Sequence, residues 1–234
     1  MAEEDLIRLN INGIFAVITL NNPTKFNALT QSLYYRLTSL LREAEGNPDI
    51  YVTILISEGP FFSAAFYSHS KILITALNRP IIRLSAALIS HSDFIYAISD
   101  AYLITPFTSL GLIAEGGSSI AFVQRIGQGK ANEALLLSRK IPISELAQVG
   151  FVNKVFEGQG NFREQVIRYL QQTFGDHLVK SSLLGTKALI RRRLVREQDK
   201  QAPLEIFGSL DRFYQGIPQA KMSEALSKSK TSRL

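Results

Sequence analysis

One carboxylate in this sequence stands in surroundings that could make it a proton carrier. Glu115 is the only acidic residue between Gly111 and Gly127, in a stretch that is otherwise apolar and rich in glycine. Burial in such surroundings raises the pKa of a carboxyl toward the working pH, where it can accept a proton and return it. The structural alternative is a glutamate at the N-terminus of a helix, where the helix dipole favours negative charge.

Other familiar kinds of catalytic site are missing from the sequence. It contains no Gly-x-Ser-x-Gly nucleophile elbow, no Walker loop and no Gly-x-Gly-x-x-Gly motif. The absence of cysteine excludes thiolate nucleophiles and disulfides. His69, His91 and His177 are isolated, without a second ligand at metal spacing. We therefore expect no metal site, and we expect these histidines at the surface or at helix ends.

The composition is that of a folded protein of ordinary charge. Of 234 residues, 46% are hydrophobic and 20% are charged. This is enough for a core and for one large domain, or one domain with an appendage. The net charge is +6, and from Lys180 onward twelve Lys or Arg face five Asp or Glu. Arg191, Arg192, Arg193 and Arg196 are interpreted as the solvated face of a helix, with a phosphate-binding face as the alternative. We expect no nucleic-acid partner, no membrane span and no secretory signal.

Hydrophobic periodicity predicts an α/β body followed by a helical tail. Asn12-Gly13 between two alternating apolar runs predicts a β-hairpin, and Thr30 is placed to cap a helix with leucines at helical spacing. Strands are expected at 6–11, 14–20, 51–57, 71–77, 94–98, 101–105 and 154–156. Further helices are expected at 84–90, 130–137, 143–149, 162–173, 177–193, 204–213 and 219–227.

Several segments carry a family resemblance that covers nearly the whole chain. Three of them are Asn22-Asn-Pro-Thr-Lys-Phe-Asn-Ala-Leu29, Pro60-Phe-Phe-Ser63 and Leu110-Gly-Leu-Ile-Ala-Glu-Gly-Gly117. Leu84-Ser-Ala-Ala-Leu88, Asp93-Phe-Ile-Tyr96 and Leu183-Leu-Gly-Thr-Lys187 add to these. In order and spacing they resemble the enoyl-CoA hydratase/isomerase (crotonase) superfamily, and most closely its fungal peroxisomal Δ3,Δ2-enoyl-CoA isomerases.

The resemblance implies a fold and a domain organisation. The fold is a crotonase-like α/β spiral of ββα/βαβ turns with a CoA cleft and a C-terminal helical trimerisation region. The spiral core is expected at 1–175, the helical region at 176–227 and a flexible targeting tail at 228–234. The resemblance also implies an acyl-CoA substrate, a homo-oligomer (trimer or hexamer), and no cofactor apart from the CoA that is part of the substrate.

The resemblance assigns residues to the expected site. The backbone N–H groups of Leu84 and of Ala64 or Ala65 would form an oxyanion hole for the thioester oxygen. The CoA and substrate site would include Lys25, Asn27, Ala28, Leu29, Phe62 and Phe107.

The resemblance favours an isomerase over a hydratase. Hydratases of this family place two glutamates on a water molecule, at positions that are Ala87 and Phe107 here, so water has no evident base. Isomerases of the matching subgroup carry one glutamate at the position of Glu115, which can move a proton from C2 to C4. The resemblance therefore predicts a Δ3,Δ2-enoyl-CoA isomerase of unsaturated fatty-acid β-oxidation, with Glu115 as base and acid. The alternatives are a catalytically impaired crotonase-fold scaffold or acyl-CoA-binding subunit, and a dienoyl-CoA isomerase.

Two departures from the family pattern touch the expected site. The family has Asn-Gly-Pro-Ala-Ile-Gly where this chain has Asn78-Arg-Pro-Ile-Ile-Arg83, so Arg83 replaces a glycine that permits close backbone approach. Its guanidinium would either block the thioester or point away. After Ser63, several tens of residues of the family have no counterpart before Ser68. Either a disordered segment was left out of the sequence, or the segment is deleted and the protein is a pseudoenzyme.

The chain ends in a tripeptide that resembles a targeting signal. Ser232-Arg-Leu234 is a conservative version of the Ser-Lys-Leu peroxisomal address. Together with the family resemblance, it predicts the peroxisome matrix as the location and a peroxisomal import receptor as a partner. Residues 228–234 would then be accessible to that receptor.

Overall fold

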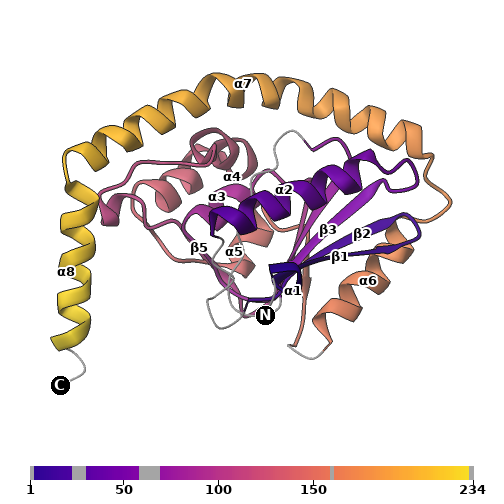
Figure 1. Ribbon diagram of the computed structural model, residues 1–234, viewed down its shortest axis with the longest axis horizontal. Helices are drawn as coiled ribbons and strands as arrows, with labels where there is room; N and C mark the ends of the chain where they lie inside the picture. Colours follow the sequence, from indigo (N-terminus) through magenta and orange to yellow (C-terminus); the bar gives the residue numbers. More distant parts are fainter. Residues whose placement is uncertain (1–2, 23–29, 58–68, 159–160, 232–234) are drawn as a thin grey trace.

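The computed structural model describes residues 3–22, 30–57, 69–158 and 161–231, which form two sheets flanked by helices (Figure 1). In this part of the chain the larger sheet has six strands in the order β1-β2-β3-β4-β6-β9, and the smaller has the order β5-β7-β8. The strands are β1 Ile7–Asn12, β2 Phe15–Leu20, β3 Val52–Ser57, β4 Ile72–Leu77, β5 Ile81–Ile82, β6 Phe94–Ile98, β7 Tyr102–Ile104, β8 Ile141–Pro142 and β9 Lys154–Phe156. The helices are α1 Glu3–Leu6, α2 Gln31–Gly46, α3 Leu84–Ile89, the 3-10 helix η2 Thr108–Leu110, α4 Ser118–Leu135, α5 Ile143–Gln148, α6 Phe162–Thr173, α7 Lys180–Tyr214 and α8 Ile217–Thr231.

Strands β1 and β2 form the predicted hairpin. They pair antiparallel from Ile7 opposite Leu20 to Asn12 opposite Phe15. Gly13, in the turn, has a φ of +57°, a backbone conformation that most other residues rarely adopt. The prediction from the Asn-Gly pair is confirmed.

Helix α2 begins at the predicted cap. The Thr30 hydroxyl oxygen accepts a hydrogen bond from the Leu33 backbone N–H at 3.4 Å. One face of α2 packs against the core and carries leucines at helical spacing. Its side chains Leu33, Leu37 and Leu40 are therefore only 2–3% exposed.

The central strands are buried along their whole length. Every residue of β3 and β4 is buried, and β2, β3, β4 and β6 pair parallel. Strands that are buried on both faces are typical of a parallel sheet covered by helices. Side chains of α2 and α6 belong to the same core cluster as these strands. Strands β5 and β7, which lead into α3 and into the loop before α4, have residues in this core. The core therefore positions both segments.

Helix α4 begins earlier than the sequence predicts. The predicted helix at 130–137 corresponds only to the last part of α4, which begins at Ser118. Gly127, with φ +74° and ψ +161°, interrupts the helical backbone. The prediction was wrong because Gly127 and Gly129 weaken the helical signal in the sequence, whereas packing of buried residues such as Phe122 holds the first part of the helix.

Helix α7 is one long element that arches over the body of the molecule (Figure 1). The sequence predicted two helices here, at 177–193 and 204–213, and that prediction was wrong. Pro203 lies inside α7, although a proline lacks an N–H group and usually ends a helix. The helix continues because Gln198 and Glu205, on either side of the proline, are hydrogen-bonded to the body.

The other tail helices follow the prediction more closely. Helix α6 spans Phe162–Thr173, the predicted range, and α8 extends the predicted 219–227 to Ile217–Thr231. Among the residues that the structure describes, no helix is both long enough and apolar enough to cross a membrane.

Candidate active site

Glu115 lies in the loop between η2 and α4, at the wall of a largely apolar cavity. The cavity has a volume of about 340 Å³ and lies between α3, this loop and α7. The carboxyl groups in its wall come from Glu115 and Glu205. The apolar side chains in its wall are Leu88, Ala202, Ile206, Leu210 and Phe213. The cavity can therefore hold an apolar group next to a carboxyl.

The surroundings of Glu115 favour its neutral form. Partial burial raises the pKa of the Glu115 carboxyl, and the nearby Glu205 carboxylate raises it further. The Arg83 guanidinium acts in the opposite direction, and the net effect is an increase in the pKa. Glu115 therefore changes protonation closer to neutral pH than an exposed glutamate does. A group that both takes and returns a proton needs this property.

The backbone that follows Glu115 adopts a conformation that favours glycine. Gly116 and Gly117 have φ angles of +67° and +76°. A Cβ atom on Gly116 would lie 2.9 Å from Leu84 Cδ1. A Cβ atom on Gly117 would clash with Gln198 Oε1. The two glycines thus let the loop pack closely against both α3 and α7.

Side chains from two other elements bind the carbonyl groups of this loop. His91 Nε2–H donates to the Gly116 carbonyl at 2.8 Å, and Gln198 Nε2 donates to the Gly117 carbonyl at 3.0 Å. His91 is 3% exposed, and burial lowers its pKa to about 4, so it is neutral near pH 7. His91 lies just after α3, which agrees with the predicted helix-end position, although it is not at the surface. The prediction is wrong for His69, which is 7% exposed and precedes β4, because its imidazole is hydrogen-bonded to the buried Thr53 hydroxyl.

Glu205 of α7 caps the N-terminus of α4. Its carboxylate is 4% exposed and accepts hydrogen bonds from the Gly117 N–H at 2.7 Å, the Ser119 N–H at 3.1 Å and the Ser119 hydroxyl. The N-cap residue of α4 is Gly117, which has no side chain for this role. Sequence reasoning missed Glu205, because nothing near it in the sequence distinguishes it from a solvent-exposed helix residue.

Leu84, whose N–H was expected in an oxyanion hole, is the first residue of α3. Within the described residues the Leu84 N–H has no hydrogen-bond partner, as is usual in the first turn of a helix. The close approach of Gly116 to the Leu84 side chain places the Glu115 loop directly against this residue. The structure thus brings the expected base and one expected oxyanion donor to neighbouring positions.

Arg83 keeps a glycine-like backbone at the position where the family pattern has glycine. Its φ is +65° and its ψ is −137°, a region that residues other than glycine seldom occupy. Its N–H donates to the Ile104 carbonyl at 2.9 Å, which ties the start of α3 to β7. The Arg83 side chain is exposed, and its positive charge still lowers the pKa of Glu115.

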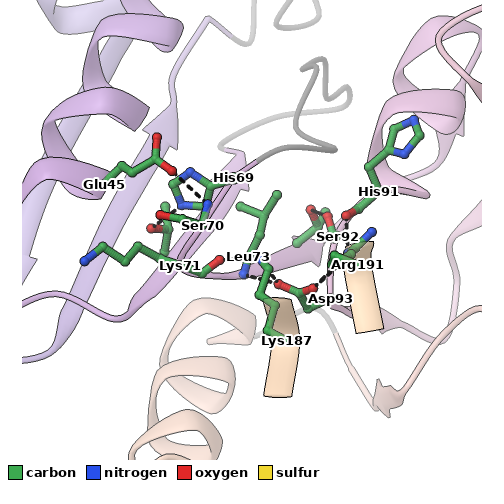
Figure 2. Close-up of polar contacts among 12 residues, drawn as sticks. Glu45, His69, Ser70, Lys71, Leu73, His91, Ser92, Asp93, Lys187 and Arg191 are labelled. Atoms are coloured by element: carbon green, nitrogen blue, oxygen red, sulfur yellow. Dashed lines mark hydrogen bonds and ion pairs between the residues drawn. The ribbon is translucent and has the colours of Figure 1, made fainter. Parts of the chain in front are cut away.

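A second polar cluster anchors α7 to the body (Figure 2). Asp93 Oδ2 accepts hydrogen bonds from Lys187 Nζ at 2.6 Å and from the Leu73 N–H at 2.7 Å. Asp93 Oδ1 accepts from Arg191 Nε at 3.0 Å. Asp93 and Lys187 belong to two of the segments that carry the family resemblance, and the fold brings them together. This cluster holds α7 where it can close the cavity.

Most residues expected to bind CoA, and one expected oxyanion donor, lie outside the described residues. These are Lys25, Asn27, Ala28, Leu29 and Phe62, together with Ala64 and Ala65. Phe107 is described, and its side chain is 1% exposed and packs in the hydrophobic core. The Phe107 side chain therefore has little surface to offer a substrate in this structure.

The sequence matches one protein family over most of its length. A sequence profile described as enoyl-CoA hydratase/isomerase matches residues 64–226. Because this range is more than half of the chain, the chain belongs to the enoyl-CoA hydratase/isomerase family. The predicted crotonase-like α/β fold is confirmed by this match and by similar solved structures.

Curated relatives and solved structures resemble nearly the whole chain. The chain is 42% identical to a Δ(3,5)-Δ(2,4)-dienoyl-CoA isomerase of Pyricularia oryzae, over 95% of this chain and 96% of the relative. It is 30% identical to a 3,2-trans-enoyl-CoA isomerase of Saccharomyces cerevisiae, over 99% and 98%. An enoyl-CoA hydratase/isomerase from Pseudoalteromonas atlantica has a TM-score of 0.88 at 23% identity, over 95% of this chain and 97% of that chain. At that identity the structural likeness shows the fold alone.

The two curated relatives contain residues that this chain lacks. The alignment with the Pyricularia protein spans 270 positions, whereas 95% of 234 residues is about 222, so about 48 positions have no counterpart here. The alignment with the Saccharomyces protein spans 275 positions against about 232 residues, a difference of about 43. These differences agree in size with the several tens of residues that the family pattern places after Ser63.

Proposed function

We propose that the protein is a Δ3,Δ2-enoyl-CoA isomerase, which moves the double bond of a 3-enoyl-CoA to the trans-2 position in the β-oxidation of unsaturated fatty acids. The observation that carries this proposal is the partly buried Glu115 carboxyl at the wall of an apolar cavity, beside the start of α3. The predicted isomerase class agrees with the names of the curated relatives, which are both isomerases.

The proposed reaction needs one base and one oxyanion site. Ionised Glu115 takes the proton from C2, and the electrons of the broken C–H bond spread over C2, C4 and the thioester oxygen as a dienolate. The N–H groups of Leu84 and of Ala64 or Ala65 would bind that oxygen and lower the energy of the dienolate. Protonated Glu115 then gives the proton to C4, which leaves the double bond between C2 and C3. The raised pKa of Glu115 supports both transfers.

The described residues support isomerisation over hydration. The positions at which hydratases of the family carry glutamates are Ala87 and Phe107, and their side chains are 0% and 1% exposed. Neither side chain can take a proton from a water molecule. Glu115 is the remaining carboxyl among the expected site residues, and one carboxyl suffices for moving a proton between two carbons.

The binding of the substrate is proposed partly from the resemblance. The residues assigned to CoA and substrate are Lys25, Asn27, Ala28, Leu29 and Phe62. Phe107, which the resemblance also assigns to this site, is left out of the proposal because its side chain is 1% exposed in the core. The acyl chain would enter the cavity of about 340 Å³, whose apolar wall suits CH₂ groups. No separate cofactor is proposed, because the CoA is part of the substrate.

A dienoyl-CoA isomerase is the second candidate, favoured by the 42% identity to the Pyricularia protein of that name. A catalytically impaired scaffold or acyl-CoA-binding subunit is favoured by Arg83 and by the residues that the chain lacks.

One experiment separates the three candidate functions: incubation of the purified protein with trans-3-hexenoyl-CoA, with a 3,5-dienoyl-CoA and with trans-2-hexenoyl-CoA. Conversion of the first to the 2-enoyl product supports our proposal. Conversion of only the second would establish the dienoyl activity, hydration of the third would contradict both, and no turnover by the folded protein would favour a scaffold.

We also propose that the protein assembles as a trimer or hexamer through residues 176–227. Apolar side chains exposed on α7 support this, because monomers seldom leave many large apolar groups in water. Among them are Leu189 (73% exposed), Ile190 (64%), Leu204 (63%) and Phe207 (67%). Light scattering measures the mass in solution, and a mass equal to one chain would contradict the proposal.

The proposed location is the peroxisome matrix, with Ser232-Arg-Leu234 bound by a peroxisomal import receptor. A fluorescent protein fused to the N-terminus leaves this signal free. We expect punctate peroxisomal fluorescence in cells and diffuse fluorescence after deletion of the last three residues. Peroxisomal fluorescence that persists after the deletion would contradict the assigned role of the tripeptide.

A further inference from the structure

The loop that carries Glu115 is held by a helix that begins 65 residues later in the chain, at Lys180. The Gly117 N–H donates to Glu205 at 2.7 Å, and the Gly117 carbonyl accepts from Gln198 at 3.0 Å. Both partners are buried, 4% and 3% exposed. Because the backbone of Gly117 is bonded on both sides to α7, movement of α7 moves the loop.

The carboxylate of Glu205 has a second effect on the same loop. It accepts hydrogen bonds from the backbone N–H groups of Gly117 and Ser119 at the start of α4. The negative charge of Glu205 therefore lies at the N-terminus of α4, the positive end of the helix dipole. Glu205 also lines the same cavity as Glu115. In this cavity of low polarity the Glu205 carboxylate disfavours ionisation of the Glu115 carboxyl and so raises its pKa.

We propose that Glu205 is a positioning residue of the active site: from α7, it fixes the backbone that carries Glu115 and supplies a second carboxylate beside it. This inference rests on the proposed isomerase function of Glu115. It makes the C-terminal helical region part of the active site of its own chain. The charge of Glu205 accounts for part of the raised pKa of Glu115.

Other titratable or charged groups around the Glu115 loop come from two elements, α3 with its flanking residues and α7. Arg83 precedes α3 and lowers the pKa of Glu115. His91, just after α3, is neutral near pH 7 because its own pKa is lowered to about 4. Arg212 of α7 lines a neighbouring cavity together with Ala114. Glu205 is therefore the group in this set that pushes the Glu115 pKa upward.

The variants Glu205→Gln and Glu205→Ala separate the charge from the hydrogen bonds. Glutamine has nearly the same size and can still accept from the Gly117 N–H, but it carries no charge. Alanine removes both. Glu197→Gln on the same helix is the matched control, because Glu197 pairs with Arg193, whose side chain is 87% exposed. Circular dichroism establishes that each variant is folded.

The first measurement is the pH profile of kcat/KM for trans-3-hexenoyl-CoA. The rate rises with pH as Glu115 ionises, so a lower pKa of Glu115 moves this ascending limb to lower pH. We expect that shift in Glu205→Gln, with a rate at the plateau within a few-fold of the parent. In Glu205→Ala we expect the plateau rate to fall by about ten- to a hundredfold, because the loop is no longer held. The control should match the parent in both respects.

The second measurement does not depend on activity. The Glu115 carboxyl is titrated by carbon-13 NMR, with its signal identified by its loss in Glu115→Gln. A lower pKa of Glu115 in Glu205→Gln supports the inference even if the parent fails to isomerise any substrate, in which case only the proposed function is lost. An unchanged Glu115 pKa in folded Glu205→Gln would overturn the inference and leave Glu205 as a helix cap alone.

Discussion

Replacement of Asp93 by alanine tests whether the polar cluster of Figure 2 is what fastens α7 to the body. The carboxylate of Asp93 is 12% exposed and lies between Lys187 and Arg191, whose side chains are 8% and 14% exposed. It also accepts the Leu73 N–H. Alanine at this position would leave two buried cations and one backbone donor without their anionic partner.

The expected loss follows from this burial. Removal of one partner from a buried ion pair typically costs about 3–5 kcal/mol, far more than the same change at a surface. Folded domains have free energies of unfolding of about 5–15 kcal/mol, so the change removes a large share of the stability. For a chain of this length we expect the thermal midpoint to fall by roughly 6–20 °C.

Urea unfolding followed by circular dichroism measures the loss directly. Glu197→Gln breaks the exposed pair with Arg193 on the same helix, while the glutamine oxygen can still accept a hydrogen bond from Gln124, so we expect a stability close to that of the parent. A loss below about 1 kcal/mol in Asp93→Ala, similar to this control, would refute the reasoning. It would mean that the other contacts of α7, its apolar packing and the hydrogen bonds of Gln198 and Glu205, keep the helix in place.

Three further predictions follow from backbone strain and buried histidines. Gly117→Ala is expected to destabilise the protein by about 1–3 kcal/mol, because φ is +76° and the new Cβ would meet neighbouring atoms. For Gly129→Ala, no atom of the described residues lies within 4 Å of the new Cβ, and we expect this variant to be neutral or to stabilise by up to about 1 kcal/mol. Arg83→Gly is expected to stabilise the protein by about 1 kcal/mol, because glycine adopts a φ of +65° freely. A change from pH 7 to pH 5 is expected to remove about 2 kcal/mol for each of His69 and His91, because their pKa is lowered to about 4 in the folded protein and the unfolded state binds the proton from about 6.5 downward. Urea unfolding measures all three.

Each of these predictions has an outcome that contradicts it. Equal stabilities of Gly117→Ala and Gly129→Ala would show that the loop does not need glycine. A less stable Arg83→Gly variant would show that the arginine side chain contributes more than its backbone strain removes. If the double variant His69→Gln/His91→Gln loses as much stability at pH 5 as the parent does, other groups cause the pH dependence.

Elements with strong local signals could be predicted from the sequence. The Asn12-Gly13 turn and the Thr30 cap are local features, and they placed the first hairpin and α2 to within a residue or two. Parallel strands were recognisable as short, nearly continuous apolar runs. Such features depend on residues close in the chain, so one sequence contains the required information.

Elements that depend on distant contacts could not be predicted. Pro203 predicts the end of a helix. Helix α7 continues past it because Gln198 and Glu205 are hydrogen-bonded to the body, and these contacts cannot be seen in the sequence. The first half of α4 could not be predicted, because Gly127 and Gly129 weaken the helical pattern in the sequence. That half is helical because its buried residues pack against the body. In both cases tertiary packing outweighs local propensity.

The candidate site was predicted in part. Glu115 stands out in the sequence as a lone acid among apolar residues, and the structure places it in surroundings that raise its pKa. The role of Glu205 could not be found in this way, because 88 residues separate it from the Gly117 N–H that it binds. Arg83 was noted as a departure from the family pattern, but its glycine-like backbone became evident only in the structure.

The most direct test of the account compares the parent protein with Glu115→Gln in the isomerisation of trans-3-hexenoyl-CoA. Glutamine keeps the size and most contacts of the side chain but cannot take a proton from C2. We expect turnover by the parent and a loss of at least about a hundredfold in kcat for the variant, with both proteins folded and in the same assembly state. Equal turnover by the two proteins would contradict the assignment of Glu115 as the base that carries the proton from C2 to C4.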